Sequence, residues 1–192
     1  MAVDGTGILG GVFDPAHNGH VALARAAIEE LGFEDLLVLV VADPGHKRTV
    51  TPAQTRLKLA RLAFQDVAAT TLEFDHHPRT VDSLEERRVE DAVFILGADE
   101  LAGFESWKSP RRVLELVRLA VAVRPGVSRD EVRAVRERLD APGRIVEFEM
   151  EPVDVSSSQI RARAARGEPI DALVPPAVAD AIARLGLYRS AE

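Results

Sequence analysis

Short apolar runs alternate with amphipathic stretches along this chain, and that alternation constrains the fold more than any other feature. The runs have the length of β-strands and cover residues 8–13, 36–42, 92–96 and 119–123. Strands that are apolar on both sides are typical of a sheet covered on both faces. Their alternation with helical stretches therefore predicts an α/β protein with a parallel sheet between layers of helices.

Helix start and stop signals lie between these runs. Residues 18–31 place apolar side chains at helical spacing and end before Gly32, a residue typical of a helix C-terminus. A second helix is expected from Thr51 and Pro52, and a third from Ser128.

Length and composition limit the class of protein. The chain has 192 residues, of which 46% are hydrophobic and none is cysteine. A chain of this length can bury one core without disulfides or thiolate-bound metals. We expect a single domain over residues 1–192, with a C-terminal helical part from about residue 155. No apolar run approaches the ~20 residues that cross a bilayer, and no signal peptide is evident, so we expect a cytoplasmic protein without a membrane partner.

The net charge limits the partners further. The 24 Lys and Arg residues and the 31 Asp and Glu residues leave a formal charge of −7, which repels nucleic acid and anionic membranes at long range. We therefore expect no nucleic-acid partner. Small anionic ligands remain compatible with this charge, because a few local cations and backbone N–H groups can hold a phosphate.

A first glycine pattern, Gly5, Gly7 and Gly10, matches the G-x-G-x-x-G of dinucleotide-binding proteins. That motif has to follow a strand and open a helix. Here it precedes the first predicted strand, so we interpret it as the entry into that strand.

The turn after the first strand carries more information. Residues 10–20 read Gly-Gly-Val-Phe-Asp-Pro-Ala-His-Asn-Gly-His. Glycines at a strand end let a polyanion approach the backbone, and His17 and His20 share a helix face where the helix dipole favours phosphate. The alternatives are two surface histidines, or a zinc site with a third ligand from His46, His76 or His77.

Residues 10–20 resemble the signature G-G-T-F-D-P-x-H-x-G-H of the nucleotidyltransferase superfamily. Further blocks follow in the order seen in bacterial nicotinate-nucleotide adenylyltransferases: residues 44–47, 79–84, 97–99, Trp107 with Lys108, 155–161 and 173–188. The resemblance spans nearly the whole chain. It implies a Rossmann-like, doubly wound parallel sheet with a C-terminal helical segment. It also implies transfer of AMP from ATP to nicotinate mononucleotide with Mg²⁺, giving nicotinate adenine dinucleotide and pyrophosphate in NAD biosynthesis.

The resemblance also implies roles for individual residues. Catalytic roles fall on His17, His20 and Lys47. ATP binding falls on Gly10, Gly11, Val12, Phe13, Asp99, Ser157, Ser158, Ile160 and Arg161. Mononucleotide binding falls on Asp14, His46, Lys47, Arg79, Thr80 and Trp107. No protein ligand to a metal is implied, so Mg²⁺ would accompany ATP.

Several of these residues have ordinary structural alternatives. Lys47 is also compatible with a solvated loop lysine, Asp99 with a helix N-cap, and the serine run with an N-cap and its polar neighbours. Trp107 suits stacking on a pyridine ring, or packing in the core or at a subunit contact of a homo-oligomer. Thr80 is expected to cap a helix whose first N–H groups would face the nicotinate carboxylate, and Asp82 would oppose that anion unless paired.

The sequence departs from the family pattern in a few places. Val12 replaces the usual Thr or Ser, Gly45 replaces a second proline, and Pro78-Arg79 replaces a common Ser-Tyr pair. Two further functions therefore remain open. One is another H-x-G-H nucleotidyltransferase, acting on nicotinamide mononucleotide or phosphopantetheine. The other is a nucleotide-binding sensor without turnover.

Overall fold

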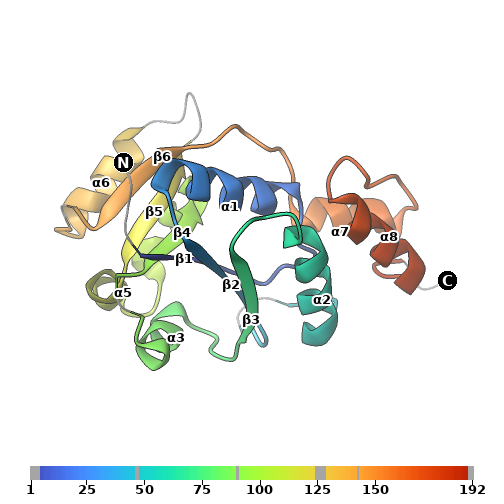
Figure 1. The fold of residues 1–192 in the computed structure, drawn as a ribbon, viewed down its shortest axis with the longest axis horizontal. Coiled ribbons are helices and arrows are strands. Elements are labelled where there is room, and N and C mark those ends of the chain that lie inside the picture. Colours follow the sequence, from blue (N-terminus) through green and yellow to red (C-terminus); the bar gives the residue numbers. More distant parts are fainter. Residues whose placement is uncertain (1–4, 46–47, 90, 124–128, 142, 190–192) are drawn as a thin grey trace.

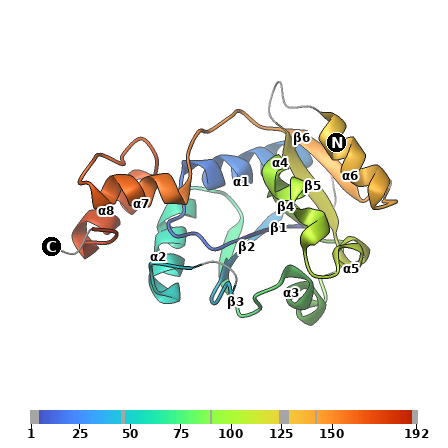
Figure 2. The same cartoon turned by 180° about the vertical axis from the view of Figure 1, so that it is seen from behind.

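The computed structural model describes residues 5–45, 48–89, 91–123, 129–141 and 143–189. Within these residues the strands are β1 (Thr6–Gly11), β2 (Asp35–Val41), β3 (Thr70–Asp75), β4 (Val93–Gly97), β5 (Arg118–Val123) and β6 (Ile145–Glu149). The helices are α1 (Asn18–Leu31), α2 (Ala53–Phe64), α3 (Thr80–Arg87), α4 (Ala98–Ala102), α5 (Pro110–Leu116), α6 (Arg129–Arg138), α7 (Ser157–Ala165) and α8 (Pro176–Leu185), with a 3₁₀ turn at Phe104–Ser106. Figures 1 and 2 show the arrangement from opposite sides.

The strands form one sheet in the order β3-β2-β1-β4-β5-β6, and every pair in it is parallel. This confirms the predicted doubly wound α/β fold. The chain starts at β1, builds outward to β3 and then returns to the other side of β1 with β4. In folds of this kind, ligands bind outside the carboxyl ends of the strands at that change of direction.

Two apolar cores lie on the two faces of the sheet. Alternate strand residues point to opposite sides, so Leu9 packs in the core beneath α1, α2 and α8, and Ile8 packs in the core beneath α3, α5 and α6. Both side chains are at most 2% exposed. Burial on both faces explains why the central strands read as continuous apolar runs.

The predicted strand boundaries need small corrections. Strand β1 covers Thr6–Gly11 rather than residues 8–13, because Phe13 has a left-handed φ of 52° and lies in the following turn. The strands predicted at 36–42 and 92–96 shift by one residue, and the strand predicted at 119–123 begins one residue earlier. The glycine pattern of residues 5–10 enters and lies within β1, so it does not form a dinucleotide-binding turn.

Two strands were not predicted, because neither is a continuous run of apolar residues. Strands β3 and β6 are the edges of the sheet: β3 alternates between half-buried and exposed residues over most of its length, and β6 mixes buried, half-buried and exposed residues. Charged residues such as Glu73 and Glu147 interrupt their apolar character. An edge strand keeps contact with solvent, so it tolerates these side chains.

The helix caps partly agree with the sequence. Gly32 ends α1 with a φ of 74°, as expected. The N-cap of α3 is Arg79 rather than Thr80, which becomes the first helical residue. Asp99 is not an N-cap either, because Gly97 caps α4. Ser128, the predicted start of the third helix, lies outside the described residues, and α6 is described from Arg129.

The C-terminal helical part is confirmed. Ser156 caps α7, and its side chain accepts a hydrogen bond from the Gln159 N–H. Helices α7 and α8 lie beyond the sheet beside α2, at one end of the molecule (Figure 1). No helix in the described part of the chain has the length and apolar character needed to span a membrane.

Candidate active site

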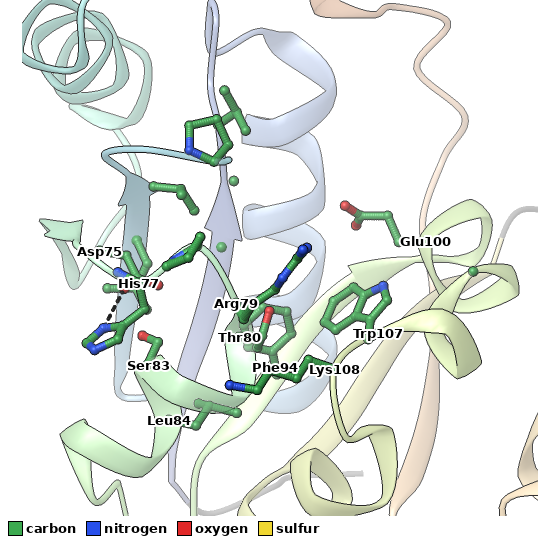
Figure 3. Close-up of a pocket in the computed structure, with 18 of the residues that line it drawn as sticks. Asp75, His77, Arg79, Thr80, Ser83, Leu84, Phe94, Glu100, Trp107 and Lys108 are labelled. Atoms are coloured by element: carbon green, nitrogen blue, oxygen red, sulfur yellow. Dashed lines mark hydrogen bonds and ion pairs between the residues drawn. The ribbon is translucent and has the colours of Figure 1, made fainter. Parts of the chain in front are cut away.

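A cavity of about 400 Å³ lies at the carboxyl ends of the central strands. Its walls come from the ends of β1, β2 and β3, from α3, and from the segment around Trp107 (Figure 3). Seven of the residues to which the resemblance assigned a binding role line it: Gly10, Gly11, Val12, Arg79, Thr80, Asp99 and Trp107.

Close packing explains the two glycines at the end of β1. A Cβ atom on Gly11 would lie 2.7 Å from the Phe13 ring, and one on Gly10 would lie 3.0 Å from the Phe94 ring. Both rings are buried, so neither can move aside easily. The glycines therefore keep the floor of the cavity flat and its backbone accessible.

Trp107 packs in the core and also faces the cavity. Its ring packs against Phe94 and Phe104, with ring centroids 6.1 Å and 5.2 Å away, and it also lines the cavity. Core contacts fix the ring in place while it remains available for stacking.

The charge of Asp82, near the start of α3, is balanced by a lysine at the surface. Lys108 donates a hydrogen bond of 2.6 Å to Asp82 Oδ1. Lys108 also lines the cavity next to Trp107. Asp82 is therefore paired, as the sequence analysis required for an anion to bind near the start of α3.

His17 and His20 lie together at the N-terminus of α1. Their rings stack with centroids 3.6 Å apart and an interplanar angle of 25°. The His17 backbone N–H donates to His20 Nδ1 at 3.2 Å. Because Nδ1 is the acceptor, a neutral His20 carries its proton on Nε2 and can donate from there.

Both imidazoles are neutral at pH 7. Burial lowers the pKa of His17 from 6.5 to about 4. Burial and the charge of the neighbouring His17 lower the pKa of His20 well below its usual value. Neutral rings can bind phosphate as N–H donors without carrying a charge in the free protein.

Phe13 packs between His20 and α2. Its ring makes edge contacts with the rings of His20 and Phe64, with ring centroids 4.9 Å and 5.9 Å apart. Only 2% of the residue is exposed. The structure thus places Phe13 outside the cavity wall. Its side chain connects α2 to the turn that leads into α1.

Asp14 organises the turn before the histidines. Its Oδ1 accepts a hydrogen bond from the Tyr188 hydroxyl at 2.8 Å. Its Oδ2 accepts from the N–H groups of Val50 at 2.7 Å and Thr51 at 3.4 Å. Both oxygens therefore hold other parts of the chain, and Asp14 does not line the cavity.

Helix α7 docks on the same turn. Ser157 Oγ donates to the Pro15 carbonyl at 2.9 Å, and Arg161 Nη1 donates to the Asp14 carbonyl at 2.6 Å. Ser158 Oγ lies 3.1 Å from Ser156 Oγ. These contacts bring the N-terminus of α7 to the N-terminus of α1, so residues from opposite ends of the sequence meet. Ile160 is fully buried and anchors α7 in the core.

Arg56 is a structural residue that the sequence did not reveal. It is 1% exposed. Its guanidinium donates hydrogen bonds of 2.7–3.1 Å to the carbonyls at the ends of β1 and β2 and before α2: Val12, Val41, Ala42 and Thr51. The planar fork of an arginine can satisfy several carbonyls at once. Arg56 therefore fixes the two loops that border the cavity.

Two predicted site residues lie outside the described part of the chain, and three residues that line the cavity had no predicted binding role. His46 and Lys47 lie outside the described residues, although Pro44 in the same loop lines the cavity. Asp75, His77 and Ser83 line the cavity although none of them was assigned a role in substrate binding, and His77 was considered only as a zinc ligand. In the described ranges no group of three His, Asp or Glu side chains could hold a metal ion, so the zinc alternative finds no support there.

The comparisons with known proteins agree with this arrangement. Residues 8–163 match the cytidylyltransferase-like family. Relatives from Thermomicrobium roseum and Rubrobacter xylanophilus are each 37% identical to this chain, over 97% and 96% of it and 92% of each relative. Both relatives carry the name "probable nicotinate-nucleotide adenylyltransferase".

Solved structures support the fold. A nicotinic acid mononucleotide adenylyltransferase from Plasmodium falciparum complexed with NaAD superposes with a TM-score of 0.74 at 16% identity, over 95% of this chain and 96% of that one. A complex of the Plasmodium enzyme with APC gives a TM-score of 0.72, with the same identity and coverage. The family match and the full-length relatives show that this chain belongs to the cytidylyltransferase-like family, among relatives named nicotinate-nucleotide adenylyltransferases.

Proposed function

We propose that this protein transfers AMP from ATP to nicotinate mononucleotide, which gives nicotinate adenine dinucleotide and pyrophosphate. The observation that carries the proposal is the position of the cavity with Trp107. It opens at the carboxyl end of β1, and the turn after that strand leads into His17 and His20. The names of the curated relatives support the same reaction.

The chemistry suits such a site. The 5′-phosphate of the mononucleotide attacks the α-phosphorus of ATP, a new P–O bond forms, and the bond to the β-phosphate oxygen breaks. A phosphate nucleophile is already ionised at neutral pH, so no strong general base is needed. Catalysis then consists of positioning the two phosphates and stabilising the charge of the transferring group.

His17 and His20 serve as N–H donors to that group. Their stacked rings are held by the helix start and by Phe13, so the donors are oriented before substrate binds. Preoriented donors stabilise developing charge better than mobile ones. Lys47 and His46, from the loop after β2, would add positive charge at the reacting phosphates.

Arg161 and the start of α7 would hold the outer phosphates of ATP. One N–H of the guanidinium is used on the Asp14 carbonyl, and the rest of the planar fork is available for a bidentate contact. Ser157 and Ser158 lie at the start of the same helix, where backbone N–H groups favour an anion. Asp99, in the cavity wall, would bind the adenosine ribose.

Mg²⁺ would enter with ATP. Magnesium is commonly held by substrate phosphates with one or two carboxylates, rather than by a protein cage. The ion would neutralise phosphate charge and help pyrophosphate to leave.

The acid form of the mononucleotide suits this cavity better than the amide. The first N–H groups of α3 begin at Thr80 in the cavity wall, and Lys108 neutralises Asp82 nearby. A carboxylate can accept from those N–H groups, and Arg79 lies at the same place. The NH₂ of an amide cannot accept, which leaves donors unpaired at about 1–3 kcal/mol each, or a preference of roughly 10- to 100-fold.

The decisive experiment incubates the protein with ATP, Mg²⁺ and either nicotinate or nicotinamide mononucleotide, and identifies the products. We expect nicotinate adenine dinucleotide, with the higher kcat/KM for the acid. Phosphopantetheine serves as a third acceptor, and turnover with it alone would assign the protein to that reaction. Binding of nucleotide without release of pyrophosphate from ATP, whichever acceptor is supplied, would identify a sensor.

A further inference from the structure

One side of the cavity carries polar groups that the contacts assigned above do not use. Figure 3 shows Asp75, His77 and Ser83 on this side, and Trp107 and Glu100 on the other. Asp75 ends β3, and Ser83 lies one helical turn after Thr80 on the face of α3 that lines the cavity. We call Asp75 and Ser83 the polar corner.

The Ser83 hydroxyl is buried without a partner. Ser83 is 2% exposed, and its Oγ forms no hydrogen bond with any residue that the structure describes. A buried hydroxyl in this state destabilises the folded protein, because it has lost water and gained nothing in return. A ligand group that bonds to it would remove this penalty.

Asp75 is also only partly satisfied. It is 5% exposed, and its Oδ1 accepts the His77 backbone N–H at 3.0 Å. The His77 ring lies between two carboxylates, with Nδ1 3.4 Å from Asp75 Oδ1 and Nε2 3.1 Å from Glu86 Oε2. Asp75 Oδ2 receives no hydrogen bond from the described residues. It remains an acceptor at the cavity wall.

These groups define the chemistry of a ligand. The Asp75 carboxylate repels the phosphate and the ring carboxylate of the mononucleotide, and it accepts hydrogen bonds from uncharged donors. Ser83 can both donate and accept. Sugar hydroxyls are the uncharged donors of the substrate, and they also accept. We propose that the polar corner binds the ribose hydroxyls of the mononucleotide, an inference that rests on the proposed function.

The test combines Ser83→Ala with the 2′-deoxy and 3′-deoxy forms of nicotinate mononucleotide. A single neutral hydrogen bond corresponds to about a 3- to 10-fold change in affinity. For the wild-type protein, at least one deoxy analogue should raise KM by that factor. Ser83→Ala should raise KM for the parent substrate similarly, leave KM for ATP unchanged, and lose the discrimination against that analogue.

Stability separates this role from a structural one. Ser83→Ala removes a hydroxyl that makes no bond in the free protein, so its Tm should be no lower than that of wild type. Ser106→Ala is the control for stability, because the Ser106 hydroxyl donates to the Gly103 carbonyl at 2.6 Å. That variant should lower Tm.

Asp75→Asn provides a second variant. The Asn side-chain oxygen can still accept the His77 N–H, so the turn keeps its hydrogen bond while the carboxylate charge is lost. We expect KM for the mononucleotide to rise and KM for ATP to stay the same. The inference is overturned if both variants distinguish the parent substrate from the deoxy analogues as wild type does. If wild type makes no dinucleotide at all, the proposed function itself fails.

Discussion

The Tyr188 hydroxyl donates a 2.8 Å hydrogen bond to Asp14 Oδ1, a residue 174 positions earlier in the chain. Tyr188 has a left-handed φ of 63°, a conformation that disfavours bulky residues. Burial of Tyr188, which is 9% exposed, and the hydrogen bond of its hydroxyl to the turn before His17 offset this backbone strain. The C-terminal segment therefore fixes the turn that leads into the proposed active site.

Tyr188→Phe tests this connection. Phe keeps the buried ring and removes only the hydroxyl, whose pKa is raised by burial, so that the wild-type group stays a donor at neutral pH. A hydrogen bond to a charged acceptor contributes about 1.5–3 kcal/mol. We expect the free energy of unfolding in urea to fall by that amount. An unchanged value would mean that the contact contributes nothing to stability.

The fold was predictable because its central strands are buried on both faces. Their continuous apolar runs, separated by helices with local start signals, predict a parallel sheet without any long-range information. Strands β3 and β6 were not predicted, because what makes each an edge strand is its pairing with one neighbouring strand, and its own composition does not show this. The cap at Arg79 was missed because arginine is not a preferred N-cap residue, and the cap at Gly97 because Asp99, two residues later, is the stronger N-cap signal.

The site was predictable where its parts are adjacent in sequence. His17 and His20 are three residues apart at a helix start, and the structure stacks their rings. Arg56 and Ser83 could not be found in this way. Each lies in an amphipathic helix and looks like an ordinary polar residue, and its burial depends on carbonyls or cavity walls supplied by distant elements.

His17→Ala and His20→Ala should each lower the rate of adenylyl transfer about 100-fold or more, by analogy with the loss of one donor to a developing oxyanion. Steady-state kinetics and an unfolding curve for each variant separate a catalytic loss from misfolding, and folding should be little affected. Near-normal turnover, or stoichiometric zinc bound by these side chains in the purified protein, would contradict the assigned role.

Arg161→Ala should weaken the use of ATP strongly and leave mononucleotide binding nearly unchanged. Arg161→Lys should restore activity only in part, because a point charge does not reproduce the planar fork. The Asp14 carbonyl also loses its 2.6 Å hydrogen bond in the Ala variant, so Tm is measured alongside KM for both substrates. An equal loss of affinity for both substrates would indicate a structural arginine.

Acid should destabilise the protein through His17. Its pKa is about 4 in the folded state and near 6.5 when exposed, so between these values the unfolded chain binds more protons. The free energy of unfolding is not reduced by His17 above pH 6.5, and it falls as the pH drops toward 4. The loss is about 2 kcal/mol at pH 5 and about 3 kcal/mol in total. Burial of His20 acts in the same direction.

His17→Asn isolates this effect. His17 is the N-cap of α1, and Asn is a favourable residue at that position, so the variant keeps the cap while it removes the titrating ring. Urea unfolding at pH 7 and pH 5 gives the free-energy difference for each protein. We expect the wild-type difference to exceed that of the variant by about 2 kcal/mol. Equal differences in the two proteins would show that His17 is not buried as a neutral ring.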